Sequence, residues 1–428
     1  MLGKTNITAL AEGGTVTEIK DYRWVQQQVG PNGNFVKAIS RNGYLAAITG
    51  NGAIVYTQDG EAWESKVLEY TDCKLNDIEW DGNRFLIAGR CTEKIAQEGS
   101  DEEVTHIVGL MLETKDFKTF TRIETPGLSN ESFASGECHH VTEYLAIWAQ
   151  NGKYKVLALS PLYVDATCTS EHVSCLTLFT GDLLRKWDSY IYGFYYDTSY
   201  DKIMTKAGGG ACPYPESISI AKNSYEMICC MHTSNGSDHF DVVLKVTPNA
   251  IEVVTALSGG GGNKKSVTVH AIECKDNLFY SSMDAREEYV LAKVSESNEI
   301  FIMSKKQNYA FVDGVYYNGC QIFLNRHGIL VIPKDKSIAD MTVDDVMEIA
   351  PEVSLNLITK AFGNIFLFGN QGAIIKSSAE TDNEEFIAVQ AMTAKKALAD
   401  ANRYTDKKYE ELEQRIAVIE SKFADGSE

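Results

Sequence analysis

Short apolar runs alternate with polar turns along most of the chain, from about residue 22 to residue 390. Runs such as Tyr44–Ile48, Arg84–Ala88 and Gln321–Leu324 are rich in β-branched and aromatic residues. They recur about every 8–12 residues without a helical period, which predicts the short strands of an all-β domain. Because about 370 residues are too many for one sandwich, the pattern favours a repeat architecture.

Two segments near the ends of this region are similar to each other. Asn42–Thr57 and Phe362–Ser377 share a turn, an apolar strand, a second turn and a Gly-Ala-Ile sequence that opens the next strand. As the first and last of seven repeats, they would give a mean period of about 53 residues, which suits four-stranded blades. We therefore predict a mainly β fold, a β-propeller of about seven blades over residues 22–390, with six to eight blades left open. The first blade is expected to have strands at 35–40, 43–49, 52–58 and 62–69.

The composition changes after Gln390. Residues 391–424 contain no Gly or Pro and are rich in helix formers, which predicts an α-helix. Heptad positions a and d carry a continuous seam: Leu398, Asn402, Thr405, Tyr409, Leu412, Ile416, Ile419 and Phe423. The seam predicts a coiled coil, and Ile at both positions favours a homotrimer. A helix that packs back on the propeller is the alternative, and residues 1–21 are expected to form a short polar N-terminal arm.

The charge balance argues against two classes of partner. The chain has 40 Lys and Arg against 59 Asp and Glu, a net charge of −19. Binding to nucleic acid or to an anionic membrane draws its affinity from Lys and Arg, so we expect no nucleic-acid partner. The sequence has no apolar stretch of about 18 residues, and it does not begin with a basic region followed by an apolar core. We therefore expect neither membrane insertion nor a signal peptide.

Candidate metal, cofactor and nucleophile motifs are weak. The ten cysteines include no Cys-x-x-Cys pair and are expected to be reduced, mostly buried thiols. Cys138 and His140 would share one face of a strand, but no second ligand pair is spaced to complete a metal site. The loop Gly259–Lys265 lacks the Gly-Lys-Ser/Thr ending of a phosphate loop. We therefore expect no metal, no cofactor and no catalytic residue.

Two turns resemble the Asp-box of sialidase-like propellers, in which a Ser or Thr, an Asp two residues later, a Gly and an aromatic residue form a hairpin. The matching residues are Thr57, Asp59, Gly60 and Trp63 in the first turn, and Thr114, Asp116 and Phe120 in a weaker second turn. The Asp would accept backbone N–H groups and the aromatic side chain would pack between blades, so the motif would stabilise the fold without supplying chemistry. Two ordinary Asp-turn hairpins are the alternative. A sialidase would also need three clustered arginines, and none of the ten arginines lies in the Phe-Arg-Ile-Pro opening of those enzymes.

One segment is a candidate recognition surface. Between residues 187 and 200 the chain has six Tyr or Trp side chains and one Phe among acidic neighbours. Such a surface can stack on sugar rings or form a protein interface. The tentative binding residues are Trp187, Tyr190, Tyr192, Tyr195 and Tyr196. An aromatic strand pair wedged between blades is the alternative.

A family resemblance suggests a context for these elements. Ala397–Leu412 is similar to an Ala-Leu-x-x-Ala-x-x-Tyr-Thr-Asp-x-Lys helix of tail-fibre and baseplate proteins from phages and prophages. The resemblance implies a non-enzymatic structural protein of a virion tail or a phage-like contractile particle, made in the cytoplasm of the bacterial host. Its partners would be other tail or baseplate proteins and a receptor on the host cell surface, such as a glycan. A carbohydrate-active hydrolase and an intracellular propeller adaptor are the alternatives.

Overall fold

The described part of the chain consists of strands and their connections. A computed structural model describes residues 5–10, 16–28, 33–96, 103–125, 141–150, 152–161, 174–182, 184, 189–192, 195–197, 202–204, 217–235, 238–247, 251–259, 269–283, 289–294, 300–304, 310–317, 319–338, 341, 345–349 and 353–379. The chain divides into two compact units, Met1–Ala379 and Glu380–Glu428. The second unit, with the expected helix at 391–424 and its seam from Leu398 to Phe423, lies outside the described residues.

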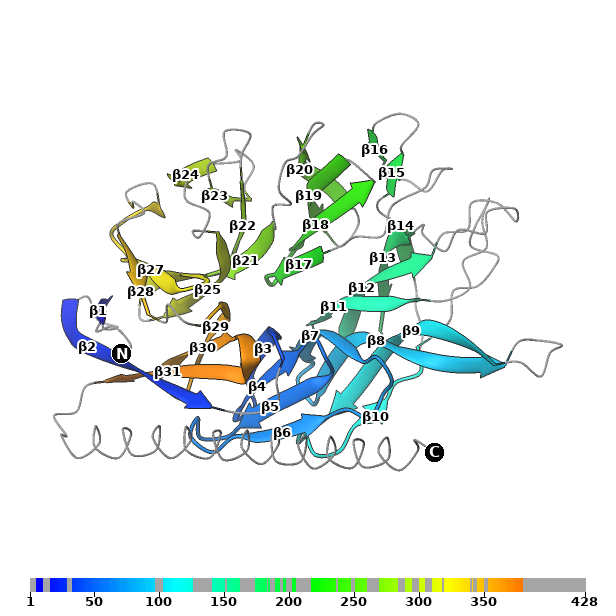
Figure 1. The fold of residues 1–428 in the computed structure, drawn as a ribbon, viewed down its shortest axis with the longest axis horizontal. Helices are drawn as coiled ribbons and strands as arrows, with labels where there is room; N and C mark the ends of the chain where they lie inside the picture. The colour runs from blue at the N-terminus through cyan, green and yellow to red at the C-terminus, as the bar shows by residue number, and fades with distance from the viewer. Residues whose placement is uncertain are drawn as a thin grey trace, which may run out of the picture. The chain divides into compact units, whose positions relative to one another are not determined.

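Seven antiparallel sheets of at least four strands follow one another along the first unit, and we call them blades one to seven (Figure 1). Blades one to three contain β3 (Phe35–Arg41), β4 (Tyr44–Thr49), β5 (Ala53–Thr57) and β6 (Glu64–Val67); β7 (Lys74–Trp80), β8 (Phe85–Ala96), β9 (Glu103–Thr114) and β10 (Thr121–Arg122); and β11 (Glu143–Gln150), β12 (Lys153–Pro161), β13 (Ser174–Gly181) and β14 (Ser189–Tyr192). Blades four to six contain β17 (Ser217–Lys222), β18 (Met227–Asn235), β19 (Asp238–Val246) and β20 (Ile251–Gly259); β21 (His270–Cys274), β22 (Asn277–Met283), β23 (Tyr289–Lys293) and β24 (Ile300–Ser304); and β25 (Phe311–Tyr317), β26 (Cys320–Asn325), β27 (Gly328–Ile332) and β28 (Val346–Glu348). A separate pair, β15 (Tyr195–Asp197) and β16 (Lys202–Met204), lies in the connection between blades three and four.

Blade seven joins the two ends of the unit. Its strands β29 (Leu355–Ala361), β30 (Asn364–Gly369) and β31 (Ala373–Ala379) come from the end of the unit, with the 3-10 turn η4 (Asn370–Gly372) between the last two. From the start of the chain, β2 (Val16–Gln28) pairs along β31 in a register that runs from Tyr22 opposite Ala379 to Gln28 opposite Ala373, and β1 (Thr5–Leu10) pairs with β2. Figure 1 shows the blue β2 beside the orange β31. Residues 1–21, expected to form an arm, therefore contribute β1 and the start of β2 to a sheet.

A buried apolar cluster lies between every two neighbouring blades. The clusters join blades one and two, two and three, three and four, four and five, five and six, six and seven, and seven and one. At the last of these contacts, Phe35 of β3 meets Phe368 of β30 with ring centroids 5.2 Å apart. Strands with both faces buried in this way are expected to show the near-continuous apolar runs seen in the sequence. The blades form a closed ring of seven, which confirms the predicted β-propeller.

The internal repeat has a direct structural counterpart. In blade one, Asn42 and Gly43 form the first hairpin turn with positive φ values of 50° and 76°. In blade seven, Phe362 and Gly363 form the same turn with φ values of 49° and 73°. Two successive residues at positive φ are the mark of a type I′ hairpin, in which glycine relieves the strain. The two segments that are similar in sequence are therefore equivalent hairpins of the first and last blades.

Candidate functional site

The first strands of the blades surround the centre of the ring. Figure 1 shows β3, β7, β11, β17, β21, β25 and β29 around a common centre. Two cavities lie along them, which we call the first and second chambers. The first chamber is lined by residues near the beginnings of these strands and has a volume of about 590 Å³. The second is lined by residues near their ends and has a volume of about 720 Å³. Both volumes are within the usual range for small-molecule sites.

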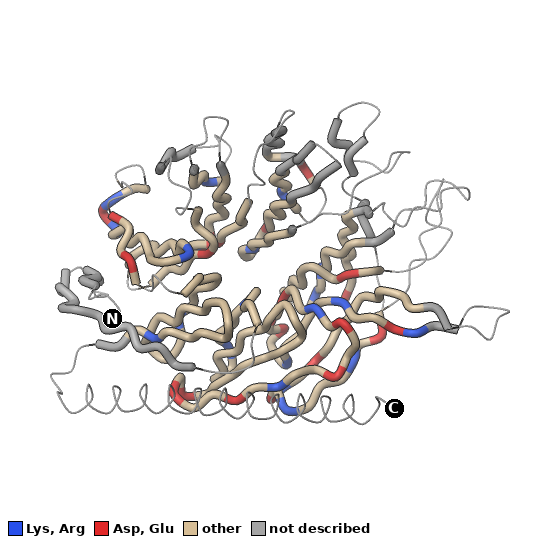
Figure 2. Tube along the Cα trace, viewed as in Figure 1, with Lys and Arg blue, Asp and Glu red and all other residues tan. Residues whose placement is uncertain are grey.

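Basic and acidic side chains face each other in these chambers. Figure 2 shows Lys and Arg positions beside Asp and Glu positions on the strands near the centre. Lys37, Lys222 and Asp313 line both chambers. The first chamber also contains Arg326 and His270. The centre of this acidic protein therefore holds cationic groups, although the chain as a whole carries a net charge of −19.

Lys222 ties three blades together. It lies at the end of β17 in blade four, and its Nζ is 2.6 Å from Asp77 Oδ2 and 2.6 Å from Glu79 Oε2, both in β7 of blade two. It also donates to the carbonyl oxygen of Ile147 in blade three. Only 12% of the Lys222 side chain and 5% of the Asp77 side chain are exposed. Burial alone would lower the pKa of Lys222, but the two carboxylates raise it above the ordinary lysine value.

Asp77 and Asp313 occupy corresponding places in their blades. Each follows a β-bulge in the first strand of its blade. Asp77 Oδ2 accepts the backbone N–H of Ile147 in the next blade at 2.8 Å, and Asp313 Oδ2 accepts that of Ile358 in the next blade at 2.9 Å. Both carboxylates therefore cross-link neighbouring inner strands. Asp313 has no lysine like Lys222 within ion-pair distance among the described residues, and burial raises its pKa to about 6, although Lys37 acts in the opposite direction.

His270 is the first residue of β21 and lines the first chamber. Its Nε2 is buried and has no hydrogen-bond partner among the described residues. Burial, assisted by the charge of Arg326, lowers the pKa of His270 to about 4. The imidazole is therefore neutral at pH 7, and its Nε2 is buried behind the chamber wall.

The Thr57 turn, residues 57–63, connects the third and fourth strands of blade one, as predicted. Asp59 Oδ1 accepts the backbone N–H groups of Glu61 and Ala62, each at 2.8 Å, and these bonds lower the pKa of Asp59. Thr57 Oγ1 accepts the backbone N–H of Gly60 at 3.0 Å. The Trp63 ring packs against Phe366 and Phe368 of blade seven with centroid distances of 6.1 Å.

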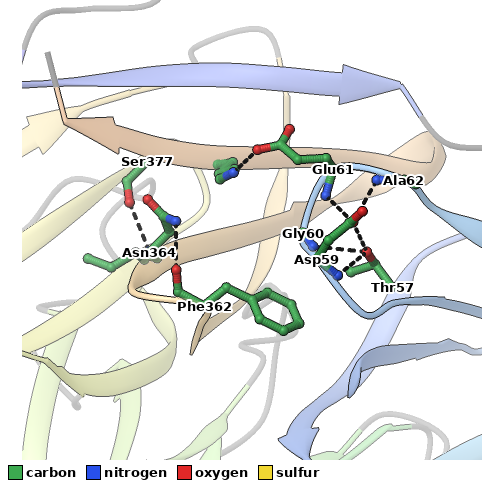
Figure 3. A network of polar contacts seen from close by, with 10 residues as sticks. Thr57, Asp59, Gly60, Glu61, Ala62, Phe362, Asn364 and Ser377 are labelled. Carbon is green, nitrogen blue, oxygen red and sulfur yellow. Dashed lines mark hydrogen bonds and ion pairs between the residues drawn. The ribbon is translucent and has the colours of Figure 1, made fainter. Parts of the chain in front are cut away.

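The Thr57 turn also makes polar contact with blade seven. Glu61 forms an ion pair with Lys376 of β31 (Figure 3). Figure 3 shows the ring of Phe362 beside the turn. A Cβ atom on Gly60 would lie 3.1 Å from Phe362 Cδ2 and 2.9 Å from Phe366 Cζ. Glycine is therefore required here both for its positive φ of 76° and for the close approach of blade seven.

The Thr114 turn, residues 114–120, connects β9 and β10 in the same way. Asp116 Oδ1 accepts the backbone N–H groups of Lys118 and Thr119 at 2.9 and 3.0 Å. At the position that corresponds to Gly60 stands Phe117, with a positive φ of 58°. Its fully buried ring stacks on Tyr56 of blade one at a centroid distance of 5.3 Å. Sequence reasoning placed Phe120 between the blades, and it does pack at the edge of this cluster, but Phe117 fills its centre.

The predicted recognition residues lie away from the centre. Tyr190 and Tyr192 belong to β14, the fourth strand of blade three, where they pair with Phe179 and Thr177. Tyr195 and Tyr196 belong to the separate β15–β16 pair. Trp187 lies outside the described residues. The recognition role of the segment therefore remains a prediction. Two of its residues are on the outermost strand of blade three and two are on the separate pair.

Other predicted features concern thiols, metals and membrane spans. Six cysteines whose side chains the structure describes are buried free thiols, as predicted: Cys73, Cys91, Cys229, Cys230, Cys274 and Cys320. The described residues include no group of three or more His, Cys, Asp or Glu that could hold a metal, and Cys138 and His140 lie outside them. No helix in the described part of the chain is long and apolar enough to cross a membrane.

Comparisons with known proteins find similarity only among solved structures. No family model and no curated protein matches the chain. A virginiamycin B lyase of Staphylococcus aureus matches 83% of this chain and 99% of its own, at 8% identity and a TM-score of 0.47. The WD40 β-propeller domain of Doa1 matches 84% and 97% at 11% identity and a TM-score of 0.45. AztD of Citrobacter koseri matches 89% and 98% at 10% identity and a TM-score of 0.39. No function follows from identities this low.

Proposed function

We propose that this chain is a non-enzymatic binding and structural component of a phage tail or a phage-like contractile particle. Its propeller would be a rigid body that presents loops to a receptor or to neighbouring subunits. The observation that carries the non-enzymatic part is the Lys222 ion-pair network. It holds Asp77 and Glu79 in fixed pairs at 2.6 Å, where a glycosidase would need carboxylates free to exchange protons and attack the substrate.

The Thr57 and Thr114 turns resemble Asp-box hairpins, and their hydrogen bonds support a structural role. In both turns the carboxylate accepts two backbone N–H groups of its own loop, and an aromatic side chain packs against the neighbouring blade. Such turns would join blades one, two and seven without contributing to chemistry. We therefore assign Asp59 and Asp116 to fold stabilisation.

The tail assignment is supported by the sequence resemblance of Ala397–Leu412 and by the heptad seam that contains it. The seam would assemble a homotrimer, and other tail or baseplate proteins would bind the trimer. The aromatic segment from Trp187 to Tyr196 would contact a receptor such as a host surface glycan. The protein would then be located in the virion after synthesis in the host cytoplasm, with no nucleic-acid partner and no membrane insertion.

The oligomeric state of the full chain tests the seam. Light scattering should give three times the protomer mass of 47.4 kDa, and Ile416→Asp combined with Ile419→Asp should give the protomer mass. A matched control, Lys407→Asp together with Glu410→Lys outside the seam, should leave the trimer intact. A single-protomer mass for the unmodified chain at micromolar concentration would contradict the trimer.

Two further measurements separate the proposal from its alternatives. An antibody to the chain should label the tails of purified particles in electron micrographs. Release of reducing sugar from cell-wall or sialylated glycans would instead establish a hydrolase. A protein absent from particles and recovered only in a cytoplasmic complex would establish an adaptor.

A further inference from the structure

Two cations of the first chamber form no ion pair with a described carboxylate. Among the described residues, no Asp or Glu oxygen lies within 4.0 Å of the Lys37 ammonium or the Arg326 guanidinium, although both residues line the chamber. The chamber's other lysines differ from these two. Lys74 is 2.7 Å from Glu143 Oε1, and Lys222 is held by Asp77 and Glu79. Lys37 interacts with Asp313 and Glu273 only at a longer distance, so Lys37 and Arg326 are available to a ligand.

Asp313 is the buried carboxylate of the chamber that interacts electrostatically with Lys37, and it already accepts two hydrogen bonds. Its Oδ1 accepts the backbone N–H of Gly314 at 2.8 Å and its Oδ2 that of Ile358 at 2.9 Å. Both oxygens thus already accept hydrogen bonds from the strands. Asp313 therefore compensates the charge of Lys37 only in part.

The remaining wall is polar. His270 contributes a neutral imidazole whose Nε2 is buried and has no partner among the described residues. Asn34, Asn356, Ser219 and Ser354 also line the chamber. Such groups donate to and accept from hydroxyl groups equally well. The volume of about 590 Å³ leaves room for a sugar-sized molecule.

We propose that the first chamber binds a small polyhydroxylated anion, a sugar that carries one carboxylate or phosphate group. Arg326 and Lys37 would bind the acid group, because a guanidinium fork and an ammonium both form charge-assisted hydrogen bonds to these oxygens. The asparagine amides would bind the ring hydroxyls. This binding would exist whether or not the chain belongs to a virion tail.

Calorimetric titration of the full chain tests the site. The probes are D-glucuronate for the carboxylate, D-glucose 6-phosphate for the phosphate, and D-glucose as a neutral control. At least one acid should bind, and glucose should bind about tenfold more weakly or not at all. No binding of either acid at millimolar concentration, or equal binding of glucose, would overturn the proposal.

Variants locate the binding in the chamber. Arg326→Gln and Lys37→Gln should each weaken binding of the acid by about tenfold or more. Lys66→Gln, a matched loss of one charge on the exposed strand β6, should leave the affinity unchanged. Unchanged affinity in both chamber variants would place binding elsewhere. Equal weakening by Lys66→Gln would indicate general attraction to surface charge, and either result would refute the site.

A second readout covers the case in which Arg326→Gln lowers the melting temperature. Arg326→Lys keeps the charge and loses the planar fork, so it should fold and bind the acid with intermediate affinity. In the unmodified protein, the ring resonances of His270, assigned by their loss in His270→Gln, should shift when the acid is added. Resonances that do not move on saturation would place the binding outside the chamber and refute the site.

Discussion

The Lys222 network makes the sharpest stability prediction. Lys222→Met keeps a long unbranched side chain but leaves Asp77 and Glu79 without their shared cation. Asp77 is 5% exposed and Glu79 is 21% exposed, so water can compensate these carboxylates only in part. Removing one partner of a buried ion pair typically costs about 3–5 kcal/mol, because the remaining charge stays buried.

Two contacts place the expected cost near the lower end of this range. Asp77 retains its hydrogen bond from the backbone N–H of Ile147 at 2.8 Å, and Glu79 is the more exposed of the two acids. We therefore expect a loss of about 3 kcal/mol in the free energy of unfolding. For a domain of this size, that corresponds to a fall in melting temperature of roughly 4 °C.

A scanning unfolding experiment with two companion variants tests the reasoning. Lys245→Met removes a lysine of blade four that is 2.7 Å from Glu226, a pair that is 32% and 25% exposed, and it should cost less than about 1 kcal/mol. Adding Asp77→Asn and Glu79→Gln to Lys222→Met removes the uncompensated charges and should recover most of the loss. The reasoning would be refuted if Lys222→Met lost no more free energy of unfolding than Lys245→Met. It would also be refuted if the triple variant were no more stable than Lys222→Met alone.

Three further perturbations address other parts of the ring. Gly60→Ala should lower the melting temperature clearly more than Gly82→Ala, because both glycines have positive φ but only Gly60 has a neighbour, Phe366, 2.9 Å from the added Cβ; equal shifts would contradict the close approach. Phe117→Ala should cost about 3–5 kcal/mol in urea unfolding, and Phe117→Gly should be about 1 kcal/mol more stable than Phe117→Ala because φ is 58° here. The pKa of Asp313 is about 6 in the folded state against 3.8 ordinarily, so the folded state binds more protons between these values. The contribution of Asp313 to the free energy of unfolding therefore falls by up to about 3 kcal/mol as the pH rises from about 4 to 6. The difference in stability between the unmodified protein and Asp313→Asn should change with pH in that window and stay constant above pH 7.

Much of the fold could be predicted because its signals are local. The strands expected at 35–40, 43–49 and 52–58 correspond to β3, β4 and β5, since alternating turns and apolar runs define each strand within a few residues. The Thr57 turn was predictable for the same reason, because its hydrogen bonds lie within one loop. Thr57 Oγ1 accepts the backbone N–H of Gly60, and Asp59 Oδ1 accepts that of Glu61. The count of seven came from a repeat period, which needs no knowledge of contacts between blades.

The site was not predictable because its signals are not local. Lys222 and Asp77 are 145 residues apart, and nothing in either segment distinguishes them from solvated charges before the ring closes. The same holds for His270 and Arg326, which meet only because two blades are adjacent. The blade edge that the closing strand β2 occupies was not predictable for a different reason. Its pairing with β31 rests on backbone hydrogen bonds, which leave no trace in a polar sequence such as Gln26–Gln28.

The net charge of −19 and a chamber that binds anions are compatible, because screening separates their effects. At physiological ionic strength the Debye length is about 8 Å, so most of the surface charge does not reach a ligand inside the ring. Inside the chamber, Lys37 and Arg326 act at contact distance in a less polar medium, where their attraction is screened far less. The acidic surface should therefore slow the approach of an anion without abolishing its binding. If so, moderate salt should raise the association rate of D-glucuronate while it lowers the affinity, and a rate that falls with added salt would show that surface cations guide the ligand instead.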